Sequence, residues 1–205
     1  ADSLRRVARE FVVDMATDGV IYAEARWAPQ QHLTGGLSAA EAVEAVQVGL
    51  VDGMESASLS GTTIIARQIL CLMRHLDVPE DVVDLAVNHA PGVVGVDVAG
   101  PEDGFPLAPF TNALTRVQAA GIHLTVHAGE AAGPESILDA LNHGAERLGH
   151  GVRIIEDRDE SGWGPTAQQV LSNQVPLEVC PTSNTQTGIC RKVAEHPLST
   201  LWSTG

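Results

Sequence analysis

The chain has 205 residues, of which 44% are hydrophobic, and its formal net charge at pH 7 is −14. A hydrophobic share of this size suffices for a sizeable core and excludes a disordered or fibrous chain. Only 12 residues are Lys or Arg, which argues against a nucleic-acid partner, because phosphate binding requires clustered cations. The three cysteines show no CxxC spacing, so neither a disulfide framework nor a structural zinc site is expected.

The N-terminal stretch ADSLRRVAREF predicts an amphipathic helix and lacks the basic and apolar regions of a signal peptide. No apolar run approaches the roughly 20 residues that span a bilayer. We therefore expect a soluble, cytoplasmic protein with no membrane partner, and the oligomeric state stays open. The first and last residues do not look like natural chain ends, so we expect a piece of a longer protein.

Helix and strand patterns alternate from the start of the chain. Apolar residues recur at helical spacing behind a possible cap at Ser3, and the apolar run at 20–29 then predicts a strand. Ser38 with Glu41 three residues later forms a capping box, which predicts a second helix. The β-branched run at 62–70 predicts a second strand.

Four further strand patterns follow, separated by helix patterns. They lie at residues 92–100, 121–129, 145–154 and 175–184. Three helix patterns open with a proline at the first helical position, namely Pro79, Pro134 and Pro165. Successive strands begin about 25 to 40 residues apart, which is the length of a βα unit and indicates a parallel sheet.

About six parallel strands with helices fit either an open doubly wound sheet or most of a (β/α)₈ barrel. Neither a Gly-x-Gly-x-x-Gly nor a GxxxxGK[ST] motif occurs in the sequence, so the nucleotide-binding open sheets lack their main signal. We therefore predict an α/β fold, an incomplete (β/α)₈ TIM barrel, with residues 1–205 forming a single partial barrel domain.

Four predicted strands carry an ionisable side chain on one face. These side chains are Glu24, Asp97, His127 and Glu178. They could lie on the wet side of edge strands. Parallel sheets are usually covered on both faces, however, so convergence on a polar cavity is the favoured interpretation.

The stretch LTVHAGEAAG ends an apolar strand pattern on His127 and places Glu130 among small residues. Barrel enzymes place their chemistry at this carboxyl end of the strands. A neutral imidazole there can bind Zn²⁺, and a nearby carboxylate can transfer protons to a bound ligand. The alternative is a hydrogen-bonded core histidine beside a solvated loop carboxylate.

The stretch RLGHGVRI places His150 at the end of the next predicted strand, 23 residues after His127. Adjacent parallel strands would present the two imidazoles side by side. In CPTSN, which ends the last predicted strand, Ser183 or Asn184 could cap a turn or contact a ligand. Cys180 has no cationic neighbour in sequence and is expected to be a core thiol rather than a nucleophile.

The stretches VDVAGPEDGFP, HAGE, RLGHGVRI and LEVCPTSN, in this order and at these intervals, resemble the adenosine deaminase family of zinc-dependent amidohydrolases. The likeness runs from about Val20 to the C-terminus and looks closest to actinobacterial members. It implies a metallo-dependent hydrolase barrel with one catalytic Zn²⁺. The implied reaction is hydrolytic deamination of adenosine or deoxyadenosine to inosine or deoxyinosine and ammonia by a zinc-activated water.

The resemblance also implies a role for each matching residue. His127 would be a zinc ligand, Glu130 the proton donor to purine N1, and His150 the residue that orients or deprotonates the attacking water. Gly100 would offer its backbone N–H to the purine base, which agrees with the close approach that a residue without Cβ permits. The expected partner is a small-molecule purine nucleoside.

Two parts of the family pattern are absent from this sequence. The family's first strand carries an HxH pair of zinc ligands and its last strand carries an aspartate that completes the site, and the chain has neither segment. Because catalytic zinc needs about three protein ligands, the chain alone is expected to be inactive. The alternatives are an inactive or partner-dependent deaminase-like fragment, or a deaminase of adenine or another 6-aminopurine.

Overall fold

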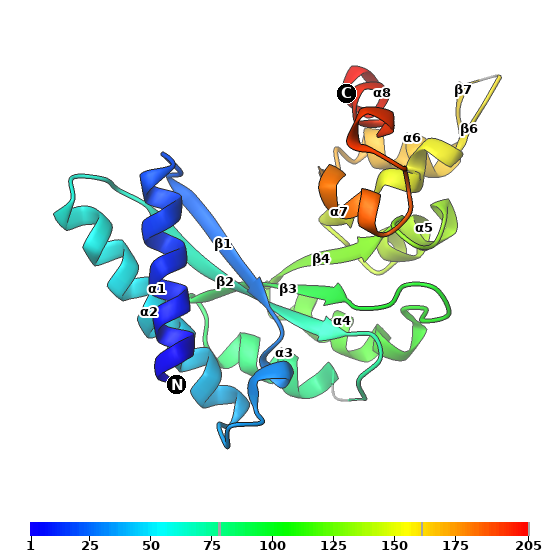
Figure 1. Cartoon of the computed structure of the whole chain (residues 1–205). Coiled ribbons are helices and arrows are strands. Elements are labelled where there is room, and N and C mark those ends of the chain that lie inside the picture. Colours follow the sequence, from blue (N-terminus) through cyan, green and yellow to red (C-terminus); the bar gives the residue numbers. More distant parts are fainter. Residues whose placement is uncertain (78, 161, 205) are drawn as a thin grey trace. The chain divides into compact units, whose positions relative to one another are not determined.

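The computed structural model describes residues 1–77, 79–160 and 162–204. Strands and helices alternate along most of these residues (Figure 1). One sheet holds six strands in the order β1-β2-β3-β4-β5-β8. The described residues divide into two compact units, residues 1–72 with 79–96 and residues 73–77 with 97–204. The single domain predicted for residues 1–205 stays a prediction.

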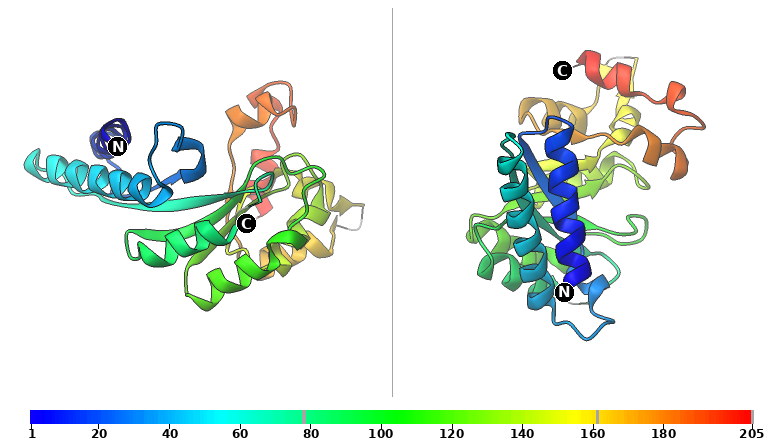
Figure 2. Two further views of the ribbon diagram at one scale, coloured as in Figure 1. Left: turned by 90° about the horizontal axis from the view of Figure 1, so that it is seen from below. Right: turned by 60° about the vertical axis from the view of Figure 1, so that its left-hand side comes forward.

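Two long helices of the first unit, α1 (Asp2–Thr17) and α2 (Ala39–Leu59), pack side by side (Figure 2). Val12 of α1 and Leu50 of α2 have no exposed surface. Most of the apolar stripe that predicted the first helix is therefore the face that α1 buries, although its Val7 is 58% exposed.

Helix starts follow the sequence signals at most positions. The capping box of Ser38 and Glu41 is confirmed, with both reciprocal hydrogen bonds present. The predicted cap at Ser3 is wrong, because α1 already begins at Asp2. The prolines open helices as predicted in α3 (Pro79–Asn88), α5 (Pro134–Asn142) and α6 (Pro165–Ser172).

The first two strands pair in parallel in the first unit. β1 (Tyr22–Trp27) lies beside β2 (Ile65–Met73), with Tyr22 opposite Ile65. The short helix η1 (Pro29–His32) follows β1. The middle of β2 is buried on both of its faces, as expected of an inner strand in a parallel sheet.

The later strands carry the candidate site. β3 (Val93–Ala99) begins in the first unit and ends in the second, and β4 (His123–Ala128) and β5 (Arg147–His150) run parallel to each other. β5 also pairs in parallel with β8 (Leu177–Glu178). The remaining helices are η2 (Ala108–Phe110), α4 (Thr111–Ala119), η3 (Val152–Glu156), α7 (Pro181–Gln186), η4 (Val193–Glu195) and α8 (Leu198–Thr204).

The six predicted strands are all present, but two are shorter than expected. The pattern at 145–154 divides into β5 and the helix η3, because Gly151 turns the backbone with a φ of +64°. β8 covers only two residues before α7 begins. An antiparallel ribbon of β6 (Arg158–Asp159) and β7 (Gly162–Trp163) was not predicted.

Because β8 is short, Cys180 lies outside the strand in which it was expected. This residue precedes α7 and is exposed, so the prediction of a core thiol is wrong. In the part of the chain that the structure describes, no helix is both long enough and apolar enough to cross a bilayer.

Candidate active site

His127 lies near the carboxyl end of β4 and contacts a buried carboxylate. Its Nδ1 is 2.9 Å from Asp97 Oδ2 and 3.0 Å from Asp97 Oδ1. The Asp97 side chain, on β3, has no exposed surface, whereas the His127 side chain is 23% exposed. A carboxylate accepts hydrogen bonds, so this contact places a proton on His127 Nδ1, and in the neutral ring Nε2 then holds the lone pair. Metal-binding histidines are commonly oriented by a carboxylate in this way.

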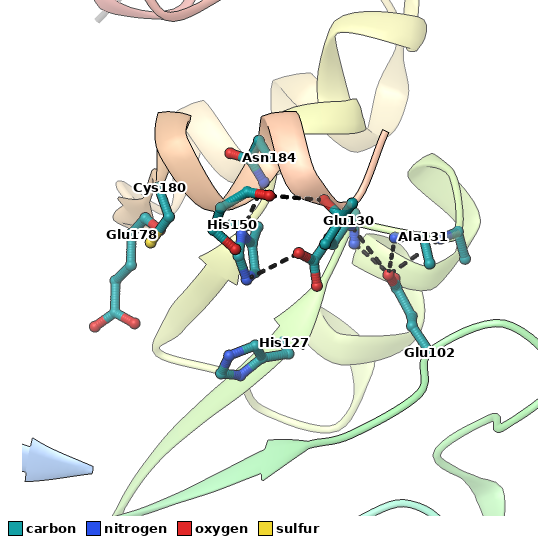
Figure 3. A network of polar contacts seen from close by, with 12 residues as sticks. Glu102, His127, Glu130, Ala131, His150, Glu178, Cys180 and Asn184 are labelled. Carbon is teal, nitrogen blue, oxygen red and sulfur yellow. Dashed lines mark hydrogen bonds and ion pairs between the residues drawn. The ribbon is translucent and has the colours of Figure 1, made fainter. Parts of the chain in front are cut away.

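A second buried carboxylate, Glu102, organises the loop that follows β4. Its Oε1 accepts from the Gly129 N–H at 2.7 Å. Its Oε2 accepts from the N–H groups of residues 130, 131 and 132 at 3.0, 2.6 and 3.1 Å. Figure 3 shows Glu102 directed at this loop. Four donors on one carboxylate satisfy the backbone amides of 129–132 and hold the segment that carries Glu130.

Glu130 and His150 approach each other beside His127 (Figure 3). His150 Nε2 lies 3.5 Å from Glu130 Oε1, and their side chains are 8% and 20% exposed. The rings of His127 and His150 have centroids 5.3 Å apart and meet at 61°. The structure therefore places the two imidazoles side by side on neighbouring strands and sets the carboxyl group of Glu130 next to them.

His150 sits in an unusual backbone conformation. Its φ is +66°, a left-handed value that few residues other than glycine adopt and that often marks functional sites. A Cβ at Gly149 would lie 2.9 Å from His127 Cγ, so this glycine leaves the room that the His127 ring occupies. Burial lowers the pKa of His150 from its ordinary value, while the Glu130 carboxyl group opposes that shift.

The Nδ1 side of His150 contacts the segment after β8. Asn184 Nδ2 is 3.0 Å from His150 Nδ1, and Asn184 Oδ1 is 3.1 Å from His196 Nε2. All three side chains are buried. Asn184 lies inside α7 and makes no capping hydrogen bond, so the turn cap considered for it is wrong.

Gly100 follows β3 with a φ of +95°. A Cβ there would lie 3.2 Å from His75 Nδ1 and 3.4 Å from the Arg74 backbone nitrogen. Both the conformation and the close neighbours favour glycine at this position. Its contact with a purine base stays a prediction.

Arg74 connects the loop after β3 to the end of β4. Its Nη2 donates to the His127 carbonyl oxygen at 2.8 Å, and its Nη1 donates to the Phe105 carbonyl oxygen. Arg74 is 6% exposed, and burial lowers the pKa of its guanidinium from the ordinary value. Arg74 thus holds the backbone carbonyl group of His127 in place.

The predicted convergence of four strand side chains is confirmed for Asp97 and His127. Glu178 instead pairs with Arg147 Nη1 at 3.2 Å. Glu24 belongs to the first unit, where it accepts a hydrogen bond from the Tyr22 hydroxyl at 2.8 Å.

Four further residues support this cluster. Sequence reasoning assigned no role to Arg74, Glu102 and His196, and it considered Asn184 only as a turn cap or a ligand contact. Glu102 and Asn184 belong to the family-like stretches VDVAGPEDGFP and LEVCPTSN. Their place in these motifs is the sequence signal that could have identified them. Arg74 and His196 lie outside the quoted stretches, in segments without regular periodicity.

The described residues fit part of a zinc site. His127, held by Asp97, has the geometry of one ligand. Among the residues that the structure describes, no group of three or more His, Cys, Asp or Glu side chains could hold a metal ion. The remaining ligands of a catalytic zinc would therefore have to come from outside these residues.

The geometry agrees with a family relationship. The model of the adenosine deaminase family matches residues 1–205. The chain belongs to the adenosine deaminase family. It is 44% identical to an adenosine deaminase from Mycolicibacterium gilvum and 45% identical to adenosine deaminase 1 from Streptomyces coelicolor. Each match covers 98% of this chain, and 57% and 52% of these relatives, respectively. The chain thus spans little more than half their length, and the predicted likeness to actinobacterial members is confirmed.

Solved structures of deaminases and amidohydrolases share this fold. An adenine deaminase from Arthrobacter aurescens superposes with a TM-score of 0.82 at 27% identity, covering 98% of this chain and 59% of that one. An amidohydrolase from Burkholderia ambifaria with bound Zn superposes with a TM-score of 0.83 at 26% identity, covering 96% and 54%. The predicted fold class, an incomplete (β/α)₈ barrel of the metallo-dependent hydrolase type, is therefore confirmed.

Proposed function

We propose that the protein hydrolyses the 6-amino group of adenosine or deoxyadenosine, forming inosine or deoxyinosine and ammonia. The observation that carries this proposal is the grouping of His127, Glu130 and His150 at the ends of β4 and β5, with His150 Nε2 3.5 Å from Glu130 Oε1. Membership of the adenosine deaminase family supports it. In the reaction, water adds at purine C6 while N1 gains a proton. The C6–N bond then breaks, and the amino group takes the proton of the new C6 hydroxyl and leaves as ammonia.

Each residue of the group has a proposed role. Glu130 donates the proton to purine N1, as a general acid on a loop that the Glu102 carboxylate holds in place. His150 orients or deprotonates the attacking water. Gly100, which has no side chain of its own, offers its backbone N–H to the purine base.

The proposed cofactor is one Zn²⁺, with His127 Nε2 among its ligands. When bound, zinc supplies a Lewis acid that lowers the pKa of a coordinated water from about 15.7 to about 7. His127 is the one ligand assigned within the described residues, and about three are needed for tight binding. We therefore expect the 205-residue chain alone to bind zinc weakly and to show no turnover.

Two alternatives have an observation in their favour. A solved structure that resembles the chain is that of an adenine deaminase, so adenine or another 6-aminopurine is the alternative substrate. The lack of a three-ligand cluster among the described residues favours an inactive or partner-dependent deaminase-like fragment. In both alternatives the proposed ligand is still a small purine. The cytoplasmic location stays a prediction.

The decisive experiment is a deamination assay on the intact protein with adenosine, deoxyadenosine and adenine. Loss of ultraviolet absorbance and release of ammonia are followed with and without a zinc chelator. Turnover of the nucleosides that the chelator abolishes supports the proposal. Turnover of adenine alone supports the alternative substrate. Absence of turnover in zinc-loaded intact protein would contradict the proposed activity.

A further inference from the structure

A chain of hydrogen bonds that ends on His150 begins at a backbone amide. The Leu198 N–H donates to His196 Nδ1 at 3.0 Å. A backbone amide can only donate, so His196 Nδ1 must accept and cannot carry a proton. The single proton of the neutral His196 ring is therefore on Nε2.

The proton on His196 Nε2 determines which way the Asn184 amide is turned. His196 Nε2 lies 3.1 Å from Asn184 Oδ1, and a donor there requires an oxygen opposite it. The amide nitrogen of Asn184 then faces His150 Nδ1 at 3.0 Å. Because an amide nitrogen can only donate, His150 Nδ1 must accept.

Burial makes this chain of donors and acceptors strict. Asn184 has no exposed surface, and His150 and His196 are each 7% exposed. Water therefore has little access to replace a mismatched pair, and a reversed amide would leave two donors facing each other.

We propose that Asn184 and His196 are positioning residues that fix the tautomer and orientation of His150, with the His150 proton on Nε2. This nitrogen is the one 3.5 Å from Glu130 Oε1. The tautomer is independent of the reaction. Its consequence rests on the proposed function: His150 faces the reacting groups as a hydrogen-bond donor, which orients the attacking water instead of removing a proton from it at Nε2.

The tautomers are measured directly by ¹⁵N NMR of the histidine rings in the intact, unliganded protein. Protonated and bare imidazole nitrogens differ strongly in ¹⁵N shift, and His150→Gln and His196→Gln assign the signals. Both rings are expected to show a bare Nδ1 and a protonated Nε2. His89 provides the internal reference, because its Nδ1 faces the Leu85 carbonyl oxygen at 2.8 Å and must carry its proton. A protonated Nδ1 on neutral His150 would overturn the proposal.

A matched pair of variants tests whether Asn184 sets the tautomer. Asn184→Asp keeps the shape and the acceptor for His196 but replaces the donor opposite His150 with an acceptor. We expect the His150 proton to move to Nδ1 in this variant. Asn184→Ala removes the constraint, and both tautomers of His150 are then expected. If neither variant folds, the wild-type spectrum alone decides the assignment of the tautomer.

Kinetics separate a positioning role from a purely structural one. With the substrate that the intact protein turns over, Asn184→Asp and Asn184→Ala are expected to lower kcat about 10- to 100-fold, as for other residues that orient a site histidine, with a smaller change in KM. Wild-type kcat in a variant whose tautomer has switched would overturn the role. A protein without deaminase activity would defeat the proposed function, whereas the NMR result would still confirm or reject the tautomer.

Discussion

The fully buried Asp97 carboxylate accepts a hydrogen bond from the His127 Nδ1–H at 2.9 Å. The pair defines which ring nitrogen can bind a metal, because the proton on Nδ1 leaves the lone pair on Nε2. The neighbouring strands β3 and β4 bring the two residues together, so the orientation of His127 is built into the sheet.

Replacing the Asp97 carboxylate should weaken metal binding. Asp97→Asn removes the charge that holds the imidazole, and the zinc affinity of the intact protein is expected to fall about 10- to 100-fold. Competition with a chromophoric chelator measures the affinity. The matched control is Glu146→Gln, which changes a carboxylate that contacts the exposed His123 at 2.7 Å. Equal zinc affinity in Asp97→Asn and in the control would contradict the orienting role of Asp97.

Replacing Glu102 should destabilise the loop after β4, although Glu102 itself lies on another loop. Glu102→Ala leaves four backbone N–H groups of residues 129–132 without their acceptor. Because a buried unsatisfied N–H costs roughly 1–3 kcal/mol and part of this loop can regain water, we expect the free energy of unfolding to fall by about 2–4 kcal/mol. Urea unfolding measures the loss.

Hydrogen exchange locates the same effect. The amides of residues 129–132 should exchange faster in Glu102→Ala than in the wild type. Glu135→Ala is the matched control, because Glu135 accepts from a single backbone N–H, that of Gly133. Unchanged protection of residues 129–132 in Glu102→Ala would show that the carboxylate does not hold the loop.

The sequence was sufficient for the parts of the site that follow from periodicity. Alternating patterns located β4 and β5, and the spacing of one βα unit placed His127 beside His150. The strand register aligns the ends of β4 and β5, with His127 opposite Gly149 and Ala128 opposite His150. Regular alternation would point the two histidines to opposite faces of the sheet, and their rings meet where the left-handed φ of His150 interrupts that alternation. Because β4 and β5 are parallel neighbours, their carboxyl ends lie at the same edge of the sheet.

The supporting residues were beyond reach of the sequence because they act through loops. Glu102 reaches amides 27 to 30 residues away, and Asn184 reaches His150 across 34 residues. No periodicity relates such positions, since the loops that join them follow local turns. The wrong prediction for Cys180 has a related cause: apolar residues continue past the two residues that pair in β8, so the strand looked longer than it is.

Glu130→Gln should remove activity without disturbing the fold. Glutamine has the size of glutamate but cannot give up a proton as a general acid, and general acid–base catalysis typically contributes about 10²- to 10⁴-fold. We expect kcat for adenosine to fall by this factor while zinc content and urea unfolding stay as in the wild type. The control is Glu156→Gln, which alters a carboxylate paired with Arg153 at 2.7 Å. Wild-type turnover in Glu130→Gln would end the assignment of Glu130 as proton donor.

Stability should fall when the solution is acidified, in part through His196. Burial lowers the pKa of His196 below its ordinary value of 6.5, so just below pH 6.5 the unfolded chain binds more protons than the folded one. The free energy of unfolding therefore decreases as pH falls below about 6.5, and above it this residue contributes no slope. His196→Gln should flatten the pH dependence of urea unfolding, although His150, whose pKa is also lowered, keeps part of it. His123→Gln, at a mostly exposed histidine, is the control. A slope that persists in full in His196→Gln would show that His196 is not buried in its neutral form. The proton positions assigned to Asn184 and His150 would then lose their starting point, which is the neutral His196 ring.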